Sequence, residues 1–333
     1  MTTPKFIQLH HEATDVVRQE LLRGLTEVSA RDGAWVSPKF LYDALGSRLF
    51  EAITELPEYY PTRTEAAIFA THGGAIAACL PPGATLIDLG AGNCAKAAGL
   101  FARLAPARYV AVDISVEFLR AALESLQRQF PAIEMVGVGL DFAEVLALPE
   151  AAGDAAAAPR VFFYPGSSIG NFTPEQALRF LTQVRAACGP LAHSGLLIGV
   201  DLVKPVDILE AAYDDALGVT AAFNRNLISS VNRLVGSNMR LADWSHLALF
   251  NTHFSRIEMH LVAQRDVAVQ WPGGGRAFVQ GERIHTENSY KWTVDGFTRL
   301  LREAGFGVPQ VWTDAMDARD GRFAVLWAPA VSV

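Results

Sequence analysis

The sequence predicts an α/β protein with a doubly wound, mostly parallel sheet and a second, smaller α+β domain. Apolar runs of five to seven residues alternate with longer helix-like runs between residues 85 and 201. A glycine turn, Gly90-Ala-Gly92, follows the first apolar run, and an acidic residue, Asp113, closes the next. After residue 204 the pattern changes to two helical stretches and then to alternating strands over 246–287.

The expected elements follow from local signals. Residues 13–28 have amphipathic helical periodicity, residues 38–61 are rich in aromatic side chains, and residues 64–80 read as a helix. The strands of the sheet are expected at 85–89, 109–113, 134–138, 160–164 and 195–201, with helices at 95–105 and 115–129. Thr173-Pro-Glu-Gln176 predicts a further helix start, because Thr is a good N-cap, Pro suits the first turn and Gln can reach back.

Beyond residue 204 the expected elements belong to two different sheets. Helices are expected at 206–216 and 219–236, and Pro272-Gly-Gly-Gly275 predicts a hairpin loop within the β-rich run. A helix at 293–305 and strands at 309–313 and 323–328 end the chain. We expect these last strands to join the first sheet.

The composition is that of a globular protein with room for two domains. Of its 333 residues, 50% are hydrophobic and 19% are charged, which argues against disorder. The formal net charge is −7 and the basic residues are scattered, which argues against a nucleic-acid partner. We find no apolar run long enough to cross a membrane and no signal-peptide core. We therefore expect a cytoplasmic monomer that acts on a small molecule.

The cysteines and histidines predict neither a disulfide framework nor a metal site. Cys79, Cys94 and Cys188 are odd in number and have no CxxC spacing. Cys94 lies in the glycine turn, where it is either a reactive thiol or, as we favour, a small filler. His253 and His260 are too far apart for one helical turn, so no metal is expected.

The glycine turn predicts an adenosine-type cofactor. Gly90 and Gly92 allow a ligand to approach where a Cβ would collide, and Asp113, 21 positions after Gly92, is placed to accept from a ribose. Gly90-x-Gly92-x-x-Ala95 also fits a dinucleotide site, so a nicotinamide-dependent oxidoreductase stays open. The long late insert and the two C-terminal strands favour the seven-stranded layout of S-adenosylmethionine-dependent methyltransferases.

Two more segments follow strands of the sheet. Asp141 and Phe142 follow the third strand, and Asp141 fits either a contact with an adenine amine or a helix N-cap. Pro165–Asn171, after the fourth strand, is either a flexible turn or part of a substrate site. The Asn171 amide favours the second interpretation, because an amide can donate to a carboxylate and accept from an amine at once.

Several longer motifs resemble those of one family. They are residues 37–50 and 56–65, Gly166-Ser-Ser-Ile-Gly-Asn171, Asp201-Leu-Val-Lys204, Ala212-Tyr-Asp-Asp215, Phe223-Asn-Arg-Asn226, Arg256-Ile-Glu-Met-His260 and Ile284-His-Thr-Glu-Asn-Ser289. In this order, from about residue 13 to about residue 328, the chain resembles the histidine-specific Nα-methyltransferases of ergothioneine biosynthesis.

The resemblance implies a fold and an activity. The fold is a Rossmann-type class I methyltransferase sheet, residues 64–203 plus 292–333, with a second, smaller α+β substrate domain, residues 1–63 plus 204–291. The activity is transfer of three methyl groups from S-adenosylmethionine to the α-amine of L-histidine, which gives hercynine.

The resemblance also implies residue roles. Tyr42 and Asn171 are the catalytic residues that orient the amine, and the substrate-binding residues are Tyr59, Tyr213, Met259, Glu287 and Ser289. Tyr59 and Tyr213 hold the carboxylate, while Glu287 and Ser289 read the imidazole and Met259 lines its pocket. The cofactor positions are Gly90, Gly92, Lys96, Asp113, Asp141 and Phe142. Phe50 and Phe223, with Tyr42 and Tyr59, either line the space for a quaternary product or are ordinary core.

Two departures from the family pattern lie in the cofactor half. Ala91 replaces a serine of the usual Gly-Ser-Gly turn and removes a hydroxyl, and Phe163-Tyr-Pro-Gly166 replaces a Phe-Leu-Gly run. Neither touches the imidazole-reading pair.

The pairing of Glu287 with Ser289 separates histidine from other substrates. Two residues apart on a strand, these side chains point to one face. Without the resemblance the same residues would read as an exposed turn. Tryptophan, the leading alternative free amino acid, offers only one ring donor and no acceptor. A sensor that binds histidine without turnover also stays open.

Overall fold

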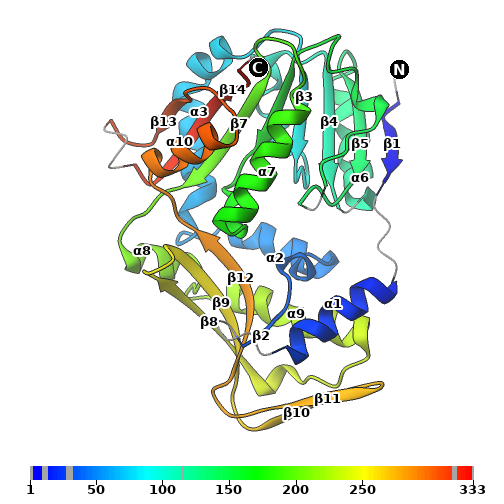
Figure 1. Ribbon diagram of the computed structural model, residues 1–333, viewed down its shortest axis with the longest axis vertical. Helices are drawn as coiled ribbons and strands as arrows, with labels where there is room; N and C mark the ends of the chain where they lie inside the picture. Colours follow the sequence, from blue (N-terminus) through cyan, green and yellow to red (C-terminus); the bar gives the residue numbers. More distant parts are fainter. Residues whose placement is uncertain are drawn as a thin grey trace. The chain divides into compact units, whose positions relative to one another are not determined.

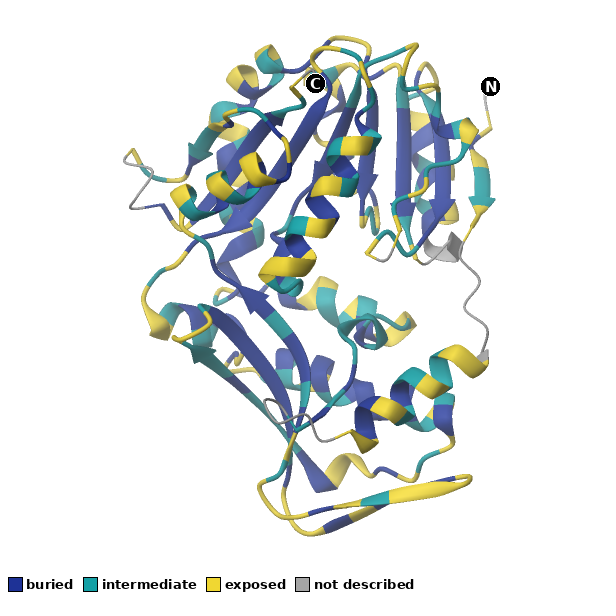
Figure 2. Ribbon diagram, viewed as in Figure 1, coloured by how far each residue is buried: buried dark blue, intermediate teal, exposed yellow. Residues whose placement is uncertain are grey.

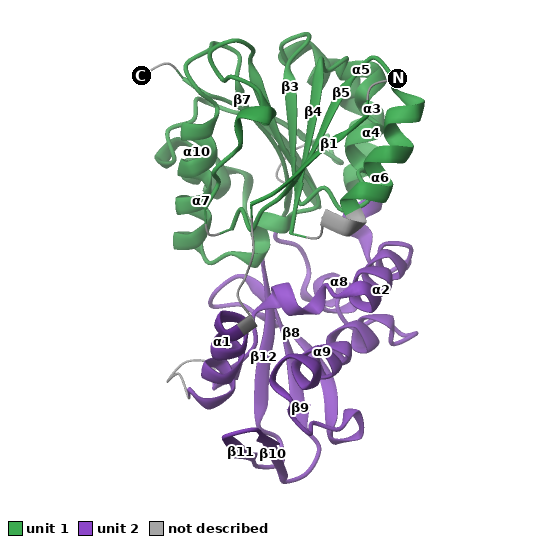
Figure 3. Ribbon diagram, turned by 90° about the vertical axis from the view of Figure 1, so that its right-hand side faces the viewer, with its two compact units in different colours: residues 1–11, 64–202, 292–333 green, residues 12–63, 203–291 purple. Residues whose placement is uncertain are grey.

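The computed structural model describes residues 3–9, 14–27, 33–114, 116–143, 145–316 and 321–331. The chain forms two compact units (Figure 3), which we describe separately. The first unit comprises residues 1–11, 64–202 and 292–333, and the second comprises residues 12–63 and 203–291. The chain therefore passes from one unit to the other four times, after residues 11, 63, 202 and 291.

The first unit is built on an eight-stranded sheet in the order β1-β5-β4-β3-β6-β7-β14-β13 (Figure 1). Its strands are β1 (Lys5–Gln8), β3 (Thr85–Leu89), β4 (Arg108–Asp113), β5 (Glu134–Gly139), β6 (Arg160–Tyr164), β7 (Gly195–Asp201), β13 (Gln310–Thr313) and β14 (Phe323–Pro329). The strands from β1 to β7 in this order pair in parallel, whereas β14 is antiparallel to both of its neighbours. The C-terminal ends of the parallel strands therefore share one edge, where doubly wound sheets bind ligands.

Helices cover both faces of this sheet. They are α3 (Tyr60–Cys79), α4 (Ala95–Ala98), α5 (Phe101–Leu104), α6 (Val116–Gln129), α7 (Pro174–Ala187) and α10 (Val294–Glu303). Residues of α7 and α10 join one apolar core, and residues of α3, α5 and α6 join the other. Figure 2 shows the difference: β3 and β7 are buried along their whole length, while α7 alternates buried and exposed residues. Strands buried on both faces explain the continuous apolar runs of the sequence.

The helix start predicted at Thr173 is confirmed. The Thr173 hydroxyl accepts from the Gln176 N–H, and the Gln176 side chain accepts from the Thr173 N–H, which completes a capping box.

Two expectations for the first unit were wrong. Residues 1–63 were assigned to the second domain, but β1 pairs in parallel with β5 at the edge of the large sheet. The helix expected over 95–105 is two short helices, because the Leu100 N–H bonds to the Ala97 carbonyl, at the tighter 3₁₀ spacing.

The second unit holds a four-stranded sheet in the order β2-β12-β9-β8 and a separate hairpin. The sheet strands are β2 (Ala34–Trp35), β8 (Trp244–Asn251), β9 (Arg256–Ala263) and β12 (Arg283–Tyr290). The hairpin is β10 (Val267–Trp271) and β11 (Gly274–Phe278), joined at the glycine-rich turn that the sequence predicted. The helices are α1 (Thr14–Thr26), α2 (Ala44–Thr54), α8 (Val206–Ala211) and α9 (Val219–Val235), with the 3₁₀ turn η1 at Pro38–Leu41.

One apolar core joins the helices of the second unit to one face of its sheet. From α9 it takes Phe223, Leu227 and Val231, and from β9 it takes alternate residues, Ile257, Met259 and Leu261. The intervening residues of β9 are charged or polar and point to the opposite face. Among the described residues no helix is both long and apolar enough to cross a membrane, and no cluster of three metal-ligating side chains occurs.

Candidate active site

The glycine turn follows β3 and is hydrogen-bonded to the C-terminal end of β4. Gly90 and Gly92 have φ angles of +71° and +52°, which favour glycine. The Gly90 N–H donates to the Val112 carbonyl, and the Gly92 N–H donates to Asp113 Oδ2 at 3.0 Å. A Cβ on Gly92 would meet open space, so the turn leaves room beside its backbone. Asp113 thus shapes the turn with one carboxylate oxygen, in addition to any ligand contact it makes.

A buried carboxylate that the sequence analysis passed over lies just before this turn. Asp88 on β3 accepts from the Tyr109 hydroxyl at 2.7 Å through Oδ2, while its buried Oδ1 has no partner among the described residues. Burial raises the pKa of Asp88 to about 7, against the hydrogen bond from Tyr109. Cys94 is also buried, and burial raises the pKa of its thiol to about 12, so the structure favours the filler interpretation.

Lys96 is joined to a second buried carboxylate that we did not predict. Its Nζ lies 2.7 Å from Oε2 of Glu65, which is 2% exposed and belongs to α3. The other oxygen of Glu65 accepts from the Gly166 N–H at 2.7 Å. Glu65 therefore connects the helix after the glycine turn to the loop after β6. A Cβ on Gly166 would lie 2.9 Å from Lys96 Nζ and would displace it, and the φ angle of +75° also favours glycine here.

The loop after β6 is a strained turn that ends at Asn171. Gly166 and Ser167 both have positive φ angles, +75° and +58°, and Ser167 is one of few non-glycine residues with this conformation. The Ser167 hydroxyl accepts from the Asp201 N–H at 2.8 Å, which fixes the loop to the end of β7. A 3₁₀ turn, Ser168–Asn171, follows. The flexible-turn interpretation is therefore wrong: the loop is bonded to the sheet.

Asp141 and Phe142 follow β5 at the same edge of the sheet. Asp141 Oδ1 accepts from the Ala143 N–H at 3.1 Å, in a turn rather than at the start of a helix. The Phe142 ring lies 3.7 Å from where a Cβ on Gly90 would be, so this ring borders the glycine turn. The helix N-cap interpretation of Asp141 is therefore wrong.

In the second unit, the aromatic residues predicted at the site form one contiguous cluster. Tyr42 contacts Phe50 and Phe223 with ring centroids 5.6 and 5.4 Å apart. Phe50 contacts Tyr59 at 6.2 Å, and Tyr59 contacts Tyr213 at 6.2 Å. These edge-to-face geometries are favourable for aromatic pairs. Phe223 is fully within the apolar core, whereas Tyr42 and Phe50 are half-buried at its border.

Asp43 fixes the segment that carries Tyr42. It caps α2 through the Gly46 N–H, and it accepts from Asn226 and Ser230 of α9 at 2.8 and 3.0 Å. Burial alone would raise the pKa of Asp43, but these hydrogen bonds and Arg233 lower it below its ordinary value. The Phe223–Asn226 motif therefore has a positioning role that the resemblance alone did not reveal.

The backbone carbonyl of Tyr213 is hydrogen-bonded to the neutral imidazole of His246. The His246 Nδ1 lies 2.9 Å from the Asn224 amide nitrogen, which can only donate, so His246 Nε2–H donates to the Tyr213 carbonyl at 2.8 Å. Burial lowers the pKa of His246, in agreement with this neutral form.

Glu287 and Ser289 occupy one face of the second sheet, as predicted, and Met259 lies on the same face. Glu287 pairs with Met259 and Ser289 pairs with Ile257 across the β12–β9 ladder, so all four share a face. The exposed-turn interpretation is wrong, since Glu287 and Ser289 are 6% and 4% exposed. Glu287 Oε2 is buried and has no hydrogen-bond partner among the described residues. Burial raises the pKa of Glu287 to about 7, and the charge of Lys291 opposes this.

A buried lysine that the sequence analysis missed binds the predicted residues. Lys291 Nζ lies 2.8 Å from Ser289 Oγ and 3.0 Å from Tyr213 Oη, and these two hydroxyls lie 2.7 Å apart. Tyr213 and Ser289, predicted to bind different ends of the substrate, are thus in direct contact.

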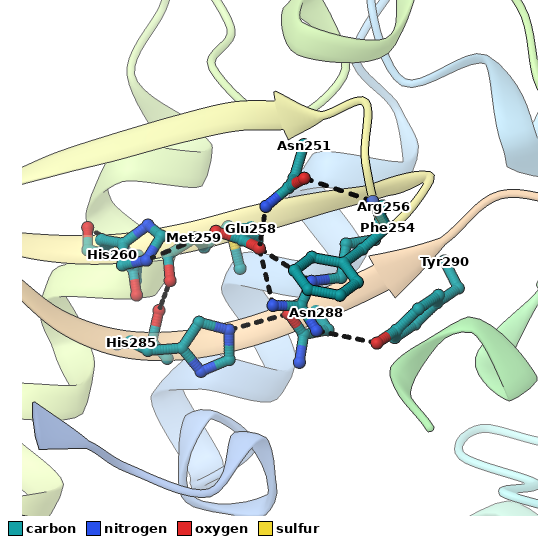
Figure 4. A network of polar contacts seen from close by, with 11 residues as sticks. Asn251, Phe254, Arg256, Glu258, Met259, His260, His285, Asn288 and Tyr290 are labelled. Carbon is teal, nitrogen blue, oxygen red and sulfur yellow. Dashed lines mark hydrogen bonds and ion pairs between the residues drawn. The ribbon is translucent and has the colours of Figure 1, made fainter. Parts of the chain in front are cut away.

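The opposite face of the same strands holds a separate polar network (Figure 4). Arg256 donates to Glu258 and to the Tyr290 hydroxyl, each at 2.7 Å, and lies over the Phe254 ring at 4.7 Å. Asn251 donates to the same oxygen of Glu258 at 2.9 Å. Burial alone would raise the pKa of Glu258, but these donors lower it below its ordinary value. The Arg256–His260 motif therefore contributes Met259 to one face and this network to the other.

The structure gathers the predicted residues into two groups, one in each unit. The residues predicted to bind the cofactor lie in the first unit, at the edge formed by β3, β4 and β5, and Asn171 belongs to that unit as well. The residues predicted to bind the substrate, other than Asn171, lie in the second unit. The residues that we missed, Asp88, Glu65 and Lys291, are all buried charged groups.

The fold and these groups define a class of protein. Seven strands in the order β5-β4-β3-β6-β7-β14-β13, with β14 antiparallel and a glycine turn after β3, are the layout of S-adenosylmethionine-dependent methyltransferases. Residues 17–328 match the family described as histidine-specific, SAM-dependent methyltransferase. The chain belongs to this family, which confirms the resemblance.

Curated relatives agree with this assignment. A histidine N-alpha-methyltransferase of Mycolicibacterium smegmatis is 37% identical over 91% of this chain and 92% of that protein. One from Mycobacterium tuberculosis is 37% identical over 83% of this chain and 86% of that protein. Ergothioneine biosynthesis protein 1 of Neurospora crassa is 30% identical over 85% of this chain, which spans only 32% of that longer protein.

Proposed function

We propose that this protein transfers three methyl groups from S-adenosylmethionine to the α-amine of L-histidine and releases hercynine, as a step of ergothioneine biosynthesis. Membership of the family and the names of the relatives support the reaction class. The single observation that carries the choice of histidine is the buried Oε2 of Glu287, which has no hydrogen-bond partner among the described residues. An unsatisfied buried carboxylate oxygen is costly unless a ligand donor completes it.

The imidazole of histidine fits the groups on this face. A neutral imidazole has one N–H donor and one acceptor nitrogen. Glu287 can accept from the first while the Ser289 hydroxyl meets the second, with Met259 beside them on the paired strand. A site built on such paired hydrogen bonds rejects a ring that lacks them by about 10⁴–10⁵. An indole uses only one of the two groups, which disfavours tryptophan.

The turn after β3 fits an adenosine-type methyl donor. Positive φ at Gly90 and Gly92, the open space beside Gly92 and the nearby Phe142 ring suit a close backbone approach. S-adenosylmethionine, when bound, supplies an electrophilic methyl group. We propose that Gly90, Gly92, Asp113, Asp141 and Phe142 hold it directly. Lys96 is paired with Glu65, so its proposed part is to hold the Gly166 loop in place.

The amine of the substrate must be neutral to react. An α-amine has a pKa of about 8, so a large part arrives protonated at neutral pH. A phenol, with a pKa of about 10 in water, is a poor base near neutral pH, so we propose that Tyr42 orients the amine while water accepts the proton. We propose the same orienting role for Asn171. The trimethylated product cannot donate a hydrogen bond, but aromatic faces such as those around Tyr42 stabilise a quaternary cation by about 0.5–2 kcal/mol each.

The test is a mass measurement. The purified protein is incubated with L-histidine and S-adenosylmethionine, and gains of one, two and three methyl groups are expected, with the trimethylated product accumulating last. Parallel incubations with tryptophan and with Nα-acetylhistidine control for the substrate. No methylated histidine under any condition, or equal methylation of tryptophan, would refute the proposal.

A variant separates substrate reading from cofactor binding. Glu287→Ala should raise the KM for histidine by at least about tenfold, because one buried hydrogen bond to a charged group is worth about 1.5–3 kcal/mol. Stabilisation of the variant by S-adenosylhomocysteine in a thermal-shift measurement should match the wild type. Equal loss of both would show that Glu287 supports the fold and does not read the ring.

A further inference from the structure

Lys291 is a buried charge next to predicted substrate residues, and the proposed function does not use it. It directly follows β12 and is 3% exposed, and its Nζ lies 4.7 Å from the centroid of the Tyr213 ring. Its ammonium donates to Ser289 at 2.8 Å and to Tyr213 at 3.0 Å. A buried lysine is unfavourable unless its charge is used, so its place next to two predicted substrate residues requires a reason.

The ammonium hydrogens of Lys291 determine whether the Ser289 hydroxyl can donate or accept a hydrogen bond. An ammonium has three donors and no acceptor, so the Ser289 oxygen must accept from Lys291. The hydroxyl of Tyr213 is 2.7 Å from the same oxygen. When Tyr213 donates to it, both lone pairs of Ser289 are used and its own hydrogen points to a ligand. Ser289 is then a donor, which suits the bare nitrogen of a neutral imidazole and opposes the second N–H of an imidazolium.

The charges act in the same direction. Lys291 already supplies one positive charge to the buried Glu287 carboxylate, whose pKa it lowers. A cationic ring would place a second positive charge beside the first in a buried environment. At close range in a partly buried site, such repulsion is several times stronger than in water.

Other titratable groups around this pair do not replace Lys291. They are Tyr213, Asp214 and Asp215 after α8, Tyr59 ahead of α3, and His246 on β8. His246 is neutral and bonded to the Tyr213 carbonyl, and Asp215 accepts from the first N–H groups of α9. The side chain of Asp214 is 57% exposed. Among the described residues, the charge of Lys291 lowers the pKa of Glu287.

We propose that Lys291 is a specificity-determining residue: by donating to Ser289 and Tyr213 and by adding a positive charge beside Glu287, it makes the site bind the imidazole of histidine in its neutral form. This inference rests on the proposed function and adds to it the protonation state of the bound ring. Lys291 acts through Glu287 and Ser289 and is therefore a positioning residue.

The test compares histidine affinity across pH in the wild type and in Lys291→Gln, each saturated with S-adenosylhomocysteine. Calorimetry covers about pH 5.5 to 8.5, which brackets the imidazole pKa of about 6.5. The glutamine can still donate a hydrogen bond but carries no charge. The readout is the ratio of the two dissociation constants at each pH, because this ratio cancels the titration of the histidine amine.

The variant should keep one proton in the complex, shared between Glu287 and the ring, whereas the wild type keeps none. Its affinity relative to the wild type should therefore fall as the pH rises, by up to about tenfold for each pH unit over which free Glu287 has the same protonation state in both proteins. Lys291→Arg, which keeps the charge, should restore the wild-type profile. Lys204→Gln is the matched control, because Lys204 also donates to a tyrosine hydroxyl, that of Tyr60, at 2.7 Å. Its ratio should show no trend with pH.

A measurement on the wild type alone keeps the inference testable if Lys291→Gln does not fold. A triazole analogue of histidine, whose ring stays uncharged over this range, should lose affinity less steeply than histidine as the pH falls. Two results would overturn the inference and leave histidine methylation intact. One is an affinity for histidine that rises relative to that for the analogue as the pH falls. The other is a ratio of Lys291→Gln to wild-type dissociation constants that does not change with pH. Absence of histidine binding to the wild type at every pH would instead overturn the proposed function.

Discussion

Two glutamates on neighbouring strands of the second sheet, Glu258 and Glu287, differ in their hydrogen-bond partners and in the direction in which their pKa is shifted. Glu258 on β9 accepts from Arg256 and Asn251, and these donors lower its pKa. Glu287 on β12 lies on the opposite face, has a buried oxygen without a partner among the described residues, and has its pKa raised to about 7 by burial. Both are buried.

The difference separates a structural carboxylate from one that is prepared for a ligand. Glu258 is satisfied inside the protein, so its charge stabilises the folded state. Burial of Glu287 without a donor for one carboxylate oxygen costs free energy, and a hydrogen-bond donor on a ligand would remove that cost, which is typical of binding sites. Perturbation of each glutamate should therefore have opposite effects on stability.

The largest effect is expected for Glu258→Gln. Removing the charge leaves Arg256 buried without its counter-ion, and the two side chains are only 11% and 9% exposed, so the free energy of unfolding should fall by about 3–5 kcal/mol. Urea denaturation measures this loss, and histidine affinity of the folded variant should stay within about twofold of the wild type, less than 0.5 kcal/mol. A loss under about 1 kcal/mol would mean that the pair behaves like a surface ion pair.

Glu287→Gln should have the opposite sign. Burial raises the pKa of Glu287 from 4.5 to about 7 in the folded protein. The protein is therefore most stable below about pH 4.5, where Glu287 is neutral, and it loses stability as the pH rises through about 7. At pH 8 the variant should therefore be more stable by about 3 kcal/mol, and this advantage should disappear towards pH 4. Thermal or urea unfolding at the two pH values measures the difference. A variant that is less stable at pH 8 would show that Glu287 has internal partners.

A slightly smaller effect is expected at His260, on the face of Glu258. Burial lowers the pKa of His260 to about 4, assisted by the charges of His285, Arg283 and Arg256. A depressed pKa gives stability that is present above about pH 6.5 and is lost as the pH falls towards 4. The wild type should lose about 2–3 kcal/mol more than His260→Gln over this range. Parallel stability curves for the two proteins would exclude a buried neutral His260.

Much of the fold was predictable because the signals are local. The apolar runs of β3 to β7 and the capping residues of α7 act within a few positions, and all of them gave the observed elements. The strand β1 was missed because four residues with polar ends, Lys5–Gln8, carry no periodic signal and gain their place only by pairing with β5.

The site was less predictable where it depends on burial. In sequence, Glu258 and Glu287 are both glutamates inside strands, and only their partners distinguish them. Lys291 has no motif of its own apart from its spacing, two residues beyond Ser289, and lysines usually lie on the surface. Glu65 and Lys96 meet across 31 positions, a contact that no local pattern indicates.

The chain crosses between the two units four times, which limits how a protein of this kind can evolve a new specificity. Neither unit is one continuous segment, since each is assembled from stretches that the other interrupts. Recombination that replaces the whole second unit would need several chain junctions to be formed at matching positions at the same time. New selectivity is therefore far more accessible through single replacements at positions such as Met259, Glu287 and Lys291 than through the shuffling of modules.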